Sequence, residues 1–204
     1  QQPGPQFSSG SRFVVTPKNA KVSDFPVIHY QQATAGGALP TIVQPVRLYP
    51  DPFRGEGHYI VLCEAYQADG GGLLNNQRAL LRQLLRKYAD ISEPWFSFEQ
   101  HYSLAYQGWL QTGSNSNGEK IFSRELAEAH SRACMTAGVL IHGVVYNISN
   151  GKGEFQIGYR GIEEEHCDAL KVADDLWLAR YLLQRICEQY SMPAAGSAVA
   201  ECDY

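Results

Sequence analysis

Three side chains with metal-binding chemistry stand out along the chain. Glu99 and His101 are two residues apart in the segment WFSFEQHYSLAY, and Glu154 lies in the later segment GEFQIGY. Both segments have the pattern of β-strands, so Glu99 and His101 share one strand face. Two carboxylates and one imidazole on neighbouring strands could hold iron or zinc with open coordination positions. The sequence leaves open whether these groups bind a metal or are polar residues without a ligand.

The other histidines favour structural roles. His130 in EAHSRAC and His142 in LIHG lie among apolar neighbours, so we expect both to be hydrogen-bonded core residues. His166 and Cys167 lie in the acidic run EEEHC, where a solvated loop is much commoner than a metal pair. No GxxxxGK[ST] run is present that would cradle a phosphate.

Composition and charge exclude several classes of partner. With 204 residues, 44% of them hydrophobic and 19% charged, the chain is a compact globular protein of one or two domains. The net charge is −4 and no run of Lys or Arg occurs, so we expect no nucleic acid contact. The apolar runs are far shorter than the roughly 20 residues that span a bilayer, so no transmembrane segment is expected, although the assembly could be membrane-bound.

Five cysteines form an odd set without a CxxC pair, so reduced thiols are expected. Such usage fits the cytoplasm or an organelle matrix and does not fit secretion. Cys63 and Cys134 fall inside a predicted strand and a predicted helix, where we expect inert buried thiols.

The first part of the chain predicts an arm, a hairpin and a helix. Residues 1–38 carry several Pro, Gly and Ser and predict an extended N-terminal arm. The segments TIVQPVRLY and HYIVLCEAY predict two strands joined by the turn DPFRGEG. NNQRALLRQLLRKYAD has leucines at helical spacing, with Asn75 or Asn76 as the helix cap. We expect residues 39–92 to form one small domain.

The second part of the chain predicts two helices and three strands. The first strand is the WFSFEQHYSLAY segment. A helix is expected over ELAEAHSRACMTA, capped by Ser123 and ended by Gly138. VLIHGVVYNI and GEFQIGY predict strands on either side of the turn SNGKG. ADDLWLARYLLQRICEQY has a helical apolar stripe, and Pro193 ends that helix. We expect a second domain over residues 93–191 and a C-terminal tail over 192–204.

Five segments, read in order, resemble the eukaryotic-type glutamine synthetase family. They are DPFRG with IVLCEAY, EPWFSFEQHY, EAHSRACMTAGV, GEFQIG and DDLWLARYLLQRICE, and they cover most of residues 40–190. The resemblance implies a small β-grasp domain followed by a catalytic domain on a curved antiparallel sheet. The expected fold is therefore α+β, with a remnant β-grasp domain at 39–92 and a truncated catalytic-type antiparallel sheet with helices at 93–191.

The resemblance also implies a chemistry and its ligands. Family members activate glutamate with ATP to γ-glutamyl phosphate, which ammonia attacks, and divalent metal ions hold the phosphates. Oxygen ligands suit the Mg²⁺ or Mn²⁺ that this chemistry uses. Matching the family's Glu-Gln-Glu-Tyr strand puts His101 at its second carboxylate, and Asn147 takes the place of another, while Glu154 is kept. Glu99 would serve a second metal site whose other ligands lie further downstream in the family.

Further departures from the family pattern agree with the loss of metal-binding carboxylates at His101 and Asn147. Val27 falls where the family has the Asp of an Asp-Gly-Ser-Ser loop, and EEEHCDALKVA is an insertion. The family's phosphate-binding arginines lie downstream of the matched segments. We therefore expect no working catalytic site, no cofactor and no bound metal, with Glu99, His101, Asn147 and Glu154 as degenerate remnants of the family sites.

Three functions follow as hypotheses. The first is a non-catalytic structural accessory subunit of a larger protein complex, expected in mitochondria and otherwise in the cytoplasm, because half of a large sheet exposes edges and an apolar face that partner subunits cover. The second is a regulatory module that joins active glutamine synthetase or senses glutamate or glutamine. The third is a residual metalloprotein that uses Glu99, His101 and Glu154. Co-purified partners and stoichiometric metal would distinguish them.

Overall fold

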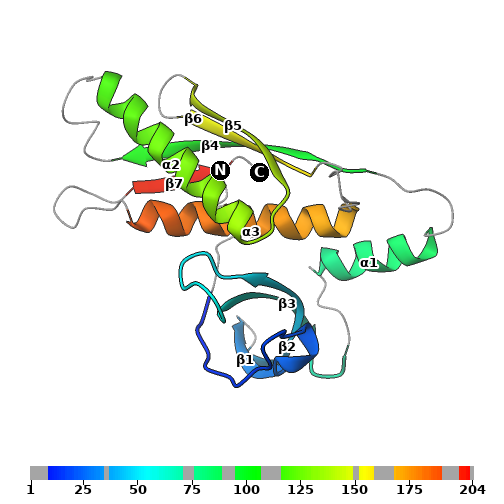
Figure 1. The fold of residues 1–204 in the computed structure, drawn as a ribbon. Helices are drawn as coiled ribbons and strands as arrows, with labels where there is room; N and C mark the ends of the chain where they lie inside the picture. Colours follow the sequence, from blue (N-terminus) through cyan, green and yellow to red (C-terminus); the bar gives the residue numbers. More distant parts are fainter. Residues whose placement is uncertain are drawn as a thin grey trace. The chain divides into compact units, whose positions relative to one another are not determined.

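The protein forms two compact units, the N-terminal unit of residues 9–93 and the C-terminal unit from residue 94 onward (Figure 1). Each unit contains an antiparallel sheet and helices, which confirms the predicted α+β class. None of the helices in the described ranges is long and apolar enough to cross a membrane. The computed structural model describes residues 9–34, 37–70, 76–88, 95–106, 116–148, 152–158, 168–189 and 198–202.

The N-terminal unit is built on a three-stranded antiparallel sheet of order β1-β2-β3. These strands are β1 (Ile28–Thr34), β2 (Gly37–Pro50) and β3 (Tyr59–Gln67), and the 3₁₀ helix η1 (Val22–Asp24) precedes them. The strand β1 lies within residues 1–38, where the sequence predicts an extended arm. This part of the predicted arm belongs to the sheet, because its backbone pairs with β2 along the whole of β1. The assignment of this sheet to a β-grasp domain stays a prediction.

The DPFRG motif forms the turn between β2 and β3. Asp51 Oδ1 accepts hydrogen bonds from the backbone N–H groups of Phe53 at 2.9 Å and Arg54 at 3.3 Å. Arg54 Nη1 donates to Asp51 Oδ2 at 2.6 Å. Gly55 then takes a φ of 84°, a left-handed value that favours glycine. Pro45, which cannot donate to the sheet, lies at a register shift of β2.

Helix α1 (Gln77–Lys87) begins at one of its two predicted caps. Asn76 Oδ1 accepts a hydrogen bond from the backbone N–H of Ala79 at 3.0 Å, which confirms Asn76 as the cap. Its Nδ2 donates to the carbonyl of Ala65 at 3.2 Å. The same side chain therefore starts the helix and attaches it to β3.

A buried carboxylate on β3 also holds α1. Glu64 is buried and forms ion pairs with Arg78 and Arg82 of the helix. Burial acts to raise the pKa of Glu64, but hydrogen bonds from Tyr66 and Arg78 and the charges of the two arginines hold that pKa below its usual value. The carboxylate therefore stays ionised and keeps both arginines in place.

The C-terminal unit contains a four-stranded antiparallel sheet of order β5-β6-β4-β7. Its strands are β4 (Phe98–Tyr106), β5 (Ile141–Ile148), β6 (Lys152–Ile157) and β7 (Ala198–Cys202). The strand β7 lies within residues 192–204, where the sequence predicts a tail. Its backbone instead pairs with β4 in antiparallel register. Residues 198–202 thus supply an edge strand to the sheet that carries Glu99 and His101.

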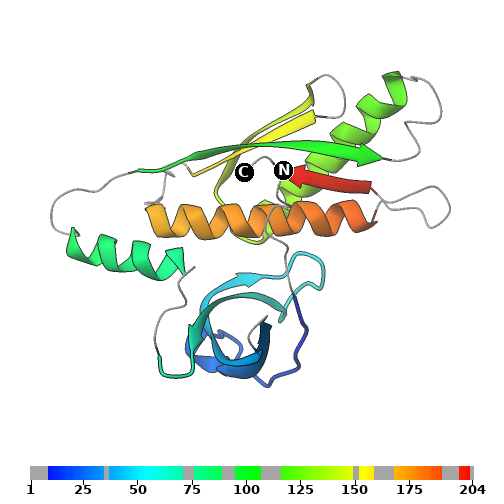
Figure 2. The same cartoon turned by 180° about the vertical axis from the view of Figure 1, so that it is seen from behind.

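Two helices, α2 (Ser116–Thr136) and α3 (Ala169–Gln189), pack on one face of this sheet. Figure 1 shows α2 in front of the strands, and Figure 2 shows the strands in front of α2. The predicted cap Ser123 is wrong, because the helix begins upstream at Ser116 and the run EKIF between them consists of residues that a helix tolerates. Gly138, with a φ of 78°, follows the end of α2 as predicted.

The core beneath the sheet centres on His130 of α2. His130 is buried, its Nε2 donates to the carbonyl of Ala179 on α3 at 2.9 Å, and its ring lies edge-on 4.8 Å from the ring of Phe155 on β6. The predicted core role is therefore confirmed for His130. It is wrong for His142, which is exposed on β5 at a register shift between Ile141 and Gly143, where the alternation of the strand is interrupted. Cys134 is the expected inert thiol, since burial raises its pKa.

A glycine lets β4 and β6 approach under a buried aromatic ring. Gly153 pairs with Tyr102 across the two strands. A Cβ atom at position 153 would lie 2.3 Å from Tyr102 Cζ, closer than any real contact. The glycine therefore leaves the space that the tyrosine ring fills.

We expect Gly153→Ala to lower the free energy of unfolding by about 1–3 kcal/mol, because the added methyl group displaces the ring of Tyr102. Urea titration followed by circular dichroism measures this change. Gly10→Ala is the matched control, since a Cβ atom at Gly10 meets nothing within 4 Å. Equal midpoints for the two variants would contradict the packing described for β4 and β6.

We expect the buried side chain of His130 to make the folded protein less stable in weak acid. Burial lowers its pKa from 6.5 to about 4, against the raising effect of the hydrogen bond to Ala179. The unfolded chain then binds one more proton than the folded chain between these values, so stability falls as the pH drops from about 6.5 towards 4. We expect roughly 2 kcal/mol of this loss between pH 7.5 and pH 5. Urea titrations at both pH values should show a smaller difference for His130→Gln; an unchanged difference would contradict the assignment.

Candidate metal centre

The register of β4 against β6 brings the predicted site residues together. His101 on β4 is directly opposite Glu154 on β6. Glu99 is two residues before His101 and therefore lies on the same face of β4. Gln100 and Tyr102 are buried on the other face, against the helices. The sheet thus separates a packed face from a face that carries carboxylates and an imidazole.

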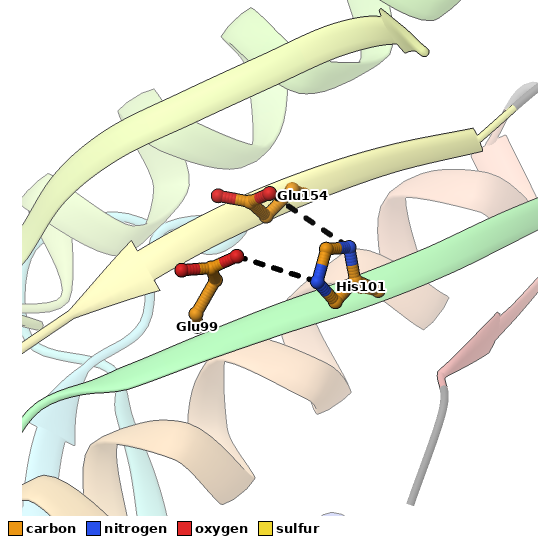
Figure 3. Close-up of side chains that lie close together, drawn as sticks. All are labelled: Glu99, His101 and Glu154. Atoms are coloured by element: carbon orange, nitrogen blue, oxygen red, sulfur yellow. Dashed lines mark ion pairs between the residues drawn. The ribbon is translucent and has the colours of Figure 1, made fainter. Parts of the chain in front are cut away.

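The imidazole of His101 lies between the two carboxylates (Figure 3). His101 Nε2 is 3.3 Å from Glu99 Oε1, and His101 Nδ1 is 3.7 Å from Glu154 Oε2. One ligand atom from each of the three residues can be chosen so that all lie within 4.8 Å of one another. Within the described ranges, this is the group of histidine, cysteine and acidic side chains that could hold a metal ion.

The three side chains differ strongly in exposure. Glu154 is 8% exposed, whereas the side chains of Glu99 and His101 are 57% and 53% exposed. Glu154 is therefore the fixed member of the group, and the other two reach solvent. Solvent access on that side leaves room for water or another ligand.

Asn147, the fourth predicted site residue, lies on β5 at a register shift between Tyr146 and Ile148. Its side chain lies outside the described part of the chain. The residue of β5 directly opposite Glu154 is Val145, which offers no donor atom to a metal. The structure thus places three of the four predicted side chains and describes only the backbone of Asn147.

Gln156 is a site residue that the sequence analysis missed. Its Nε2 donates a hydrogen bond of 2.6 Å to Glu154 Oε1, and its backbone pairs with that of Glu99. Gly143 of β5 gives it space, since a Cβ atom there would lie 2.5 Å from Gln156 Oε1. The signal was present, because Gln156 follows Glu154 by two residues and so shares its strand face.

A polar chain from α3 fixes the backbone at His101. Arg180 Nε donates to Gln100 Oε1 at 2.7 Å, and Gln100 Nε2 donates to the carbonyl of His101 at 2.7 Å. The guanidinium of Arg180 also lies over the ring of Trp177, 5.1 Å from its centroid. The position of the imidazole therefore depends on α3 as well as on the two strands.

The other residues considered lie in the N-terminal unit or outside the described residues. Val27 is exposed immediately before β1, in the N-terminal unit. His166 and Cys167 lie outside the described residues. His58 is exposed in the N-terminal unit, where its Nδ1 lies 3.2 Å from the carbonyl oxygen of Glu56.

Two chemical states suit the Glu99, His101 and Glu154 group. A doubly protonated imidazole forms an ion pair with each carboxylate. A neutral imidazole offers a nitrogen lone pair, which together with the two carboxylates makes a three-donor set for a metal ion. The arrangement can thus bind either a proton or a metal.

Comparison with known proteins identifies the family. No family model matches the chain. It is 34% identical to "Glutamine synthetase 1, mitochondrial" of Drosophila melanogaster, with 85% of this chain and 46% of that protein covered. It is 33% identical to glutamine synthetase of Debaryomyces hansenii, covering 86% and 50%, and 34% identical to that of Suillus bovinus, covering 84% and 50%. The chain spans about half the length of these relatives, and it belongs to the glutamine synthetase family.

Proposed function

We propose that this chain is a non-catalytic member of the glutamine synthetase family that serves as a structural accessory subunit of a larger protein complex. The observation that carries the proposal is the imidazole of His101, which lies between Glu99 and Glu154 where the family resemblance implies a carboxylate. The proposal covers the 204 residues of the sequence, which span about half the length of the relatives.

The donor set does not fit the Mg²⁺ or Mn²⁺ that the resemblance implies. Magnesium demands near-ideal octahedral geometry with oxygen ligands, and it is held through carboxylates, water and substrate phosphates. The group offers two carboxylates and one nitrogen donor, and Val145 stands opposite Glu154 on the third strand. Phosphoryl transfer to glutamate requires these hard ions to neutralise charge on the transferring phosphate. The group is therefore poorly suited to hold the ions that this reaction needs.

The geometry of the group points the same way. The imidazole of His101 lies between the two carboxylates, with its nitrogens 3.3 and 3.7 Å from their oxygens. A nitrogen donor therefore stands where magnesium would need an oxygen donor. The site is thus compatible with a stable fold and poorly suited to the ligase reaction.

Exposed apolar side chains support a role in protein assembly. In the described part of the C-terminal unit, large apolar side chains reach solvent on β4, on β5, on α3 and just before β4. A partner subunit that covers such side chains would remove them from water. These residues are Trp95, Phe96, Phe98, Val145 and Trp177, together with Met135 on α2.

A mitochondrial location completes the proposal. The names of two relatives assign one to mitochondria and one to the cytoplasm, so both locations occur among related proteins. The usage of cysteine fits either compartment. We propose the mitochondrial location for this chain.

We expect the full natural protein to show no ATP-dependent formation of γ-glutamyl hydroxamate with either Mg²⁺ or Mn²⁺, because the group lacks a third carboxylate. An active glutamine synthetase in the same buffer is the positive control. Turnover that co-elutes with the protein and is lost in Glu154→Gln would contradict the non-catalytic proposal, since that change removes one of the two remaining carboxylates.

We also expect gentle isolation of the native protein from its own cells to yield a defined complex whose other subunits are unrelated to glutamine synthetase. Size-exclusion chromatography and mass spectrometry identify these subunits, and organelle fractionation locates them. Isolation as an active ring with glutamine synthetase subunits would refute the accessory role and favour a regulatory one. A protein that migrates as a monomer at native concentration would also refute it.

A further inference from the structure

We propose that Glu99, His101 and Glu154 bind one divalent transition-metal ion with the preferences of Zn²⁺, and that this ion ties β4 to β6. The inference goes beyond the proposed function, which states only that the chemistry of Mg²⁺ and Mn²⁺ is lost. It starts from the disagreement between the donor set and those ions. One imidazole nitrogen with two carboxylates is a donor set that zinc accepts.

The spacing of the donors fits a single small ion. Zinc binds imidazole nitrogen and carboxylate oxygen at about 2.0–2.2 Å, so donors in a tetrahedral site lie roughly 3.3–3.5 Å apart. The contact of 3.3 Å to Glu99 involves His101 Nε2, and the contact of 3.7 Å to Glu154 involves His101 Nδ1, so a single ion uses only one of these two nitrogens. With one nitrogen chosen, the three ligand atoms lie within 4.8 Å of one another, and a turn of the exposed Glu99 side chain brings its carboxylate closer to the other two.

The identity of the donors selects the ion. Imidazole suits zinc, iron, copper and nickel, whereas carboxylate and water suit magnesium, calcium and manganese. Two carboxylates also balance the charge of one divalent ion, so no uncompensated charge remains on the sheet. Replacing the family's carboxylate by His101 therefore changes metal preference and keeps the site neutral.

The surroundings already orient one ligand. Gln156 donates to Glu154 Oε1 at 2.6 Å, which leaves Glu154 Oε2 directed at His101. A hydrogen bond to the oxygen that does not bind the metal is the usual support for a metal-binding carboxylate. The imidazole is supported in turn by the contact of Gln100 with the backbone of His101. Since Glu99 and His101 are half-exposed, the remaining coordination position faces solvent and accepts water.

The full protein is first freed of metal, and its cysteines are kept reduced with a phosphine. We then expect it to bind one Zn²⁺ per chain, measured by equilibrium dialysis and elemental analysis. Co²⁺ should bind at the same site and give visible absorption bands that indicate a low coordination number. Gln156→Ala removes a hydrogen-bond partner of a ligand and should lower the affinity for Zn²⁺ by roughly 10–100-fold. His101→Gln removes a ligand itself and should lower the affinity by more than that. His58→Gln, on an exposed histidine of the N-terminal unit, should leave the affinity unchanged.

The variant His101→Glu tests the choice of ion independently of folding. It restores a carboxylate, so we expect the ratio of Zn²⁺ to Mn²⁺ affinity to fall, with circular dichroism unchanged. Equal affinity for Zn²⁺ in the natural chain and in His101→Gln would overturn the inference, because binding would then lie elsewhere, as at the cysteines. No stoichiometric Zn²⁺, or displacement of Zn²⁺ by millimolar Mg²⁺, would overturn it as well. The absence of Zn²⁺ binding, or its equal affinity in His101→Gln, leaves the non-catalytic proposal intact, whereas displacement by Mg²⁺ also contradicts the premise that the donor set does not fit Mg²⁺. ATP-dependent turnover refutes the non-catalytic proposal alone.

Discussion

The antiparallel register of β4 against β6 is the constraint on which the C-terminal unit depends. A strand has a period of two, so one pairing decides both faces at once. With His101 opposite Glu154, the alternate pair Tyr102 and Gly153 turns to the helices and fills the core. A slip of one residue would bury the imidazole and expose the tyrosine. The hydrophobic core therefore fixes the geometry of the polar group without contacting it.

Electrostatic balance explains how the polar face persists. Two carboxylates so close on a sheet repel each other unless a positive charge or a proton lies between them. In glutamine synthetases, as the resemblance implies, metal ions do this. Here an imidazole is placed at that point by the chain itself. The imidazole thus changes which ligands this face of the sheet can bind.

The strands and helices of the core could be predicted because their patterns are strong. The alternation in WFSFEQHYSLAY separated Glu99 and His101 from Gln100 and Tyr102, and Asn76 was identifiable as a cap. The start of α2 was missed because Ser123 resembles a cap but lies within a helix that begins upstream. The strand β7 could not be predicted, since its small residues have no alternating pattern and gain order only by pairing with β4. Gln156 was missed although its spacing from Glu154 places both on one strand face, because its hydrogen bond to Glu154 is visible only in the structure.

The pairing of β4 with β7 has a consequence for the order of events during synthesis. Tyr102 pairs with Cys202, so β4 emerges from the ribosome well before its edge partner, after α2, β5, β6 and α3. Contacts this distant in sequence close large loops and form slowly. Until then, one edge of β4 has unsatisfied backbone groups that another strand could capture. The nascent chain therefore passes through a stage in which the strand that carries Glu99 and His101 is open to mispairing and to chaperones.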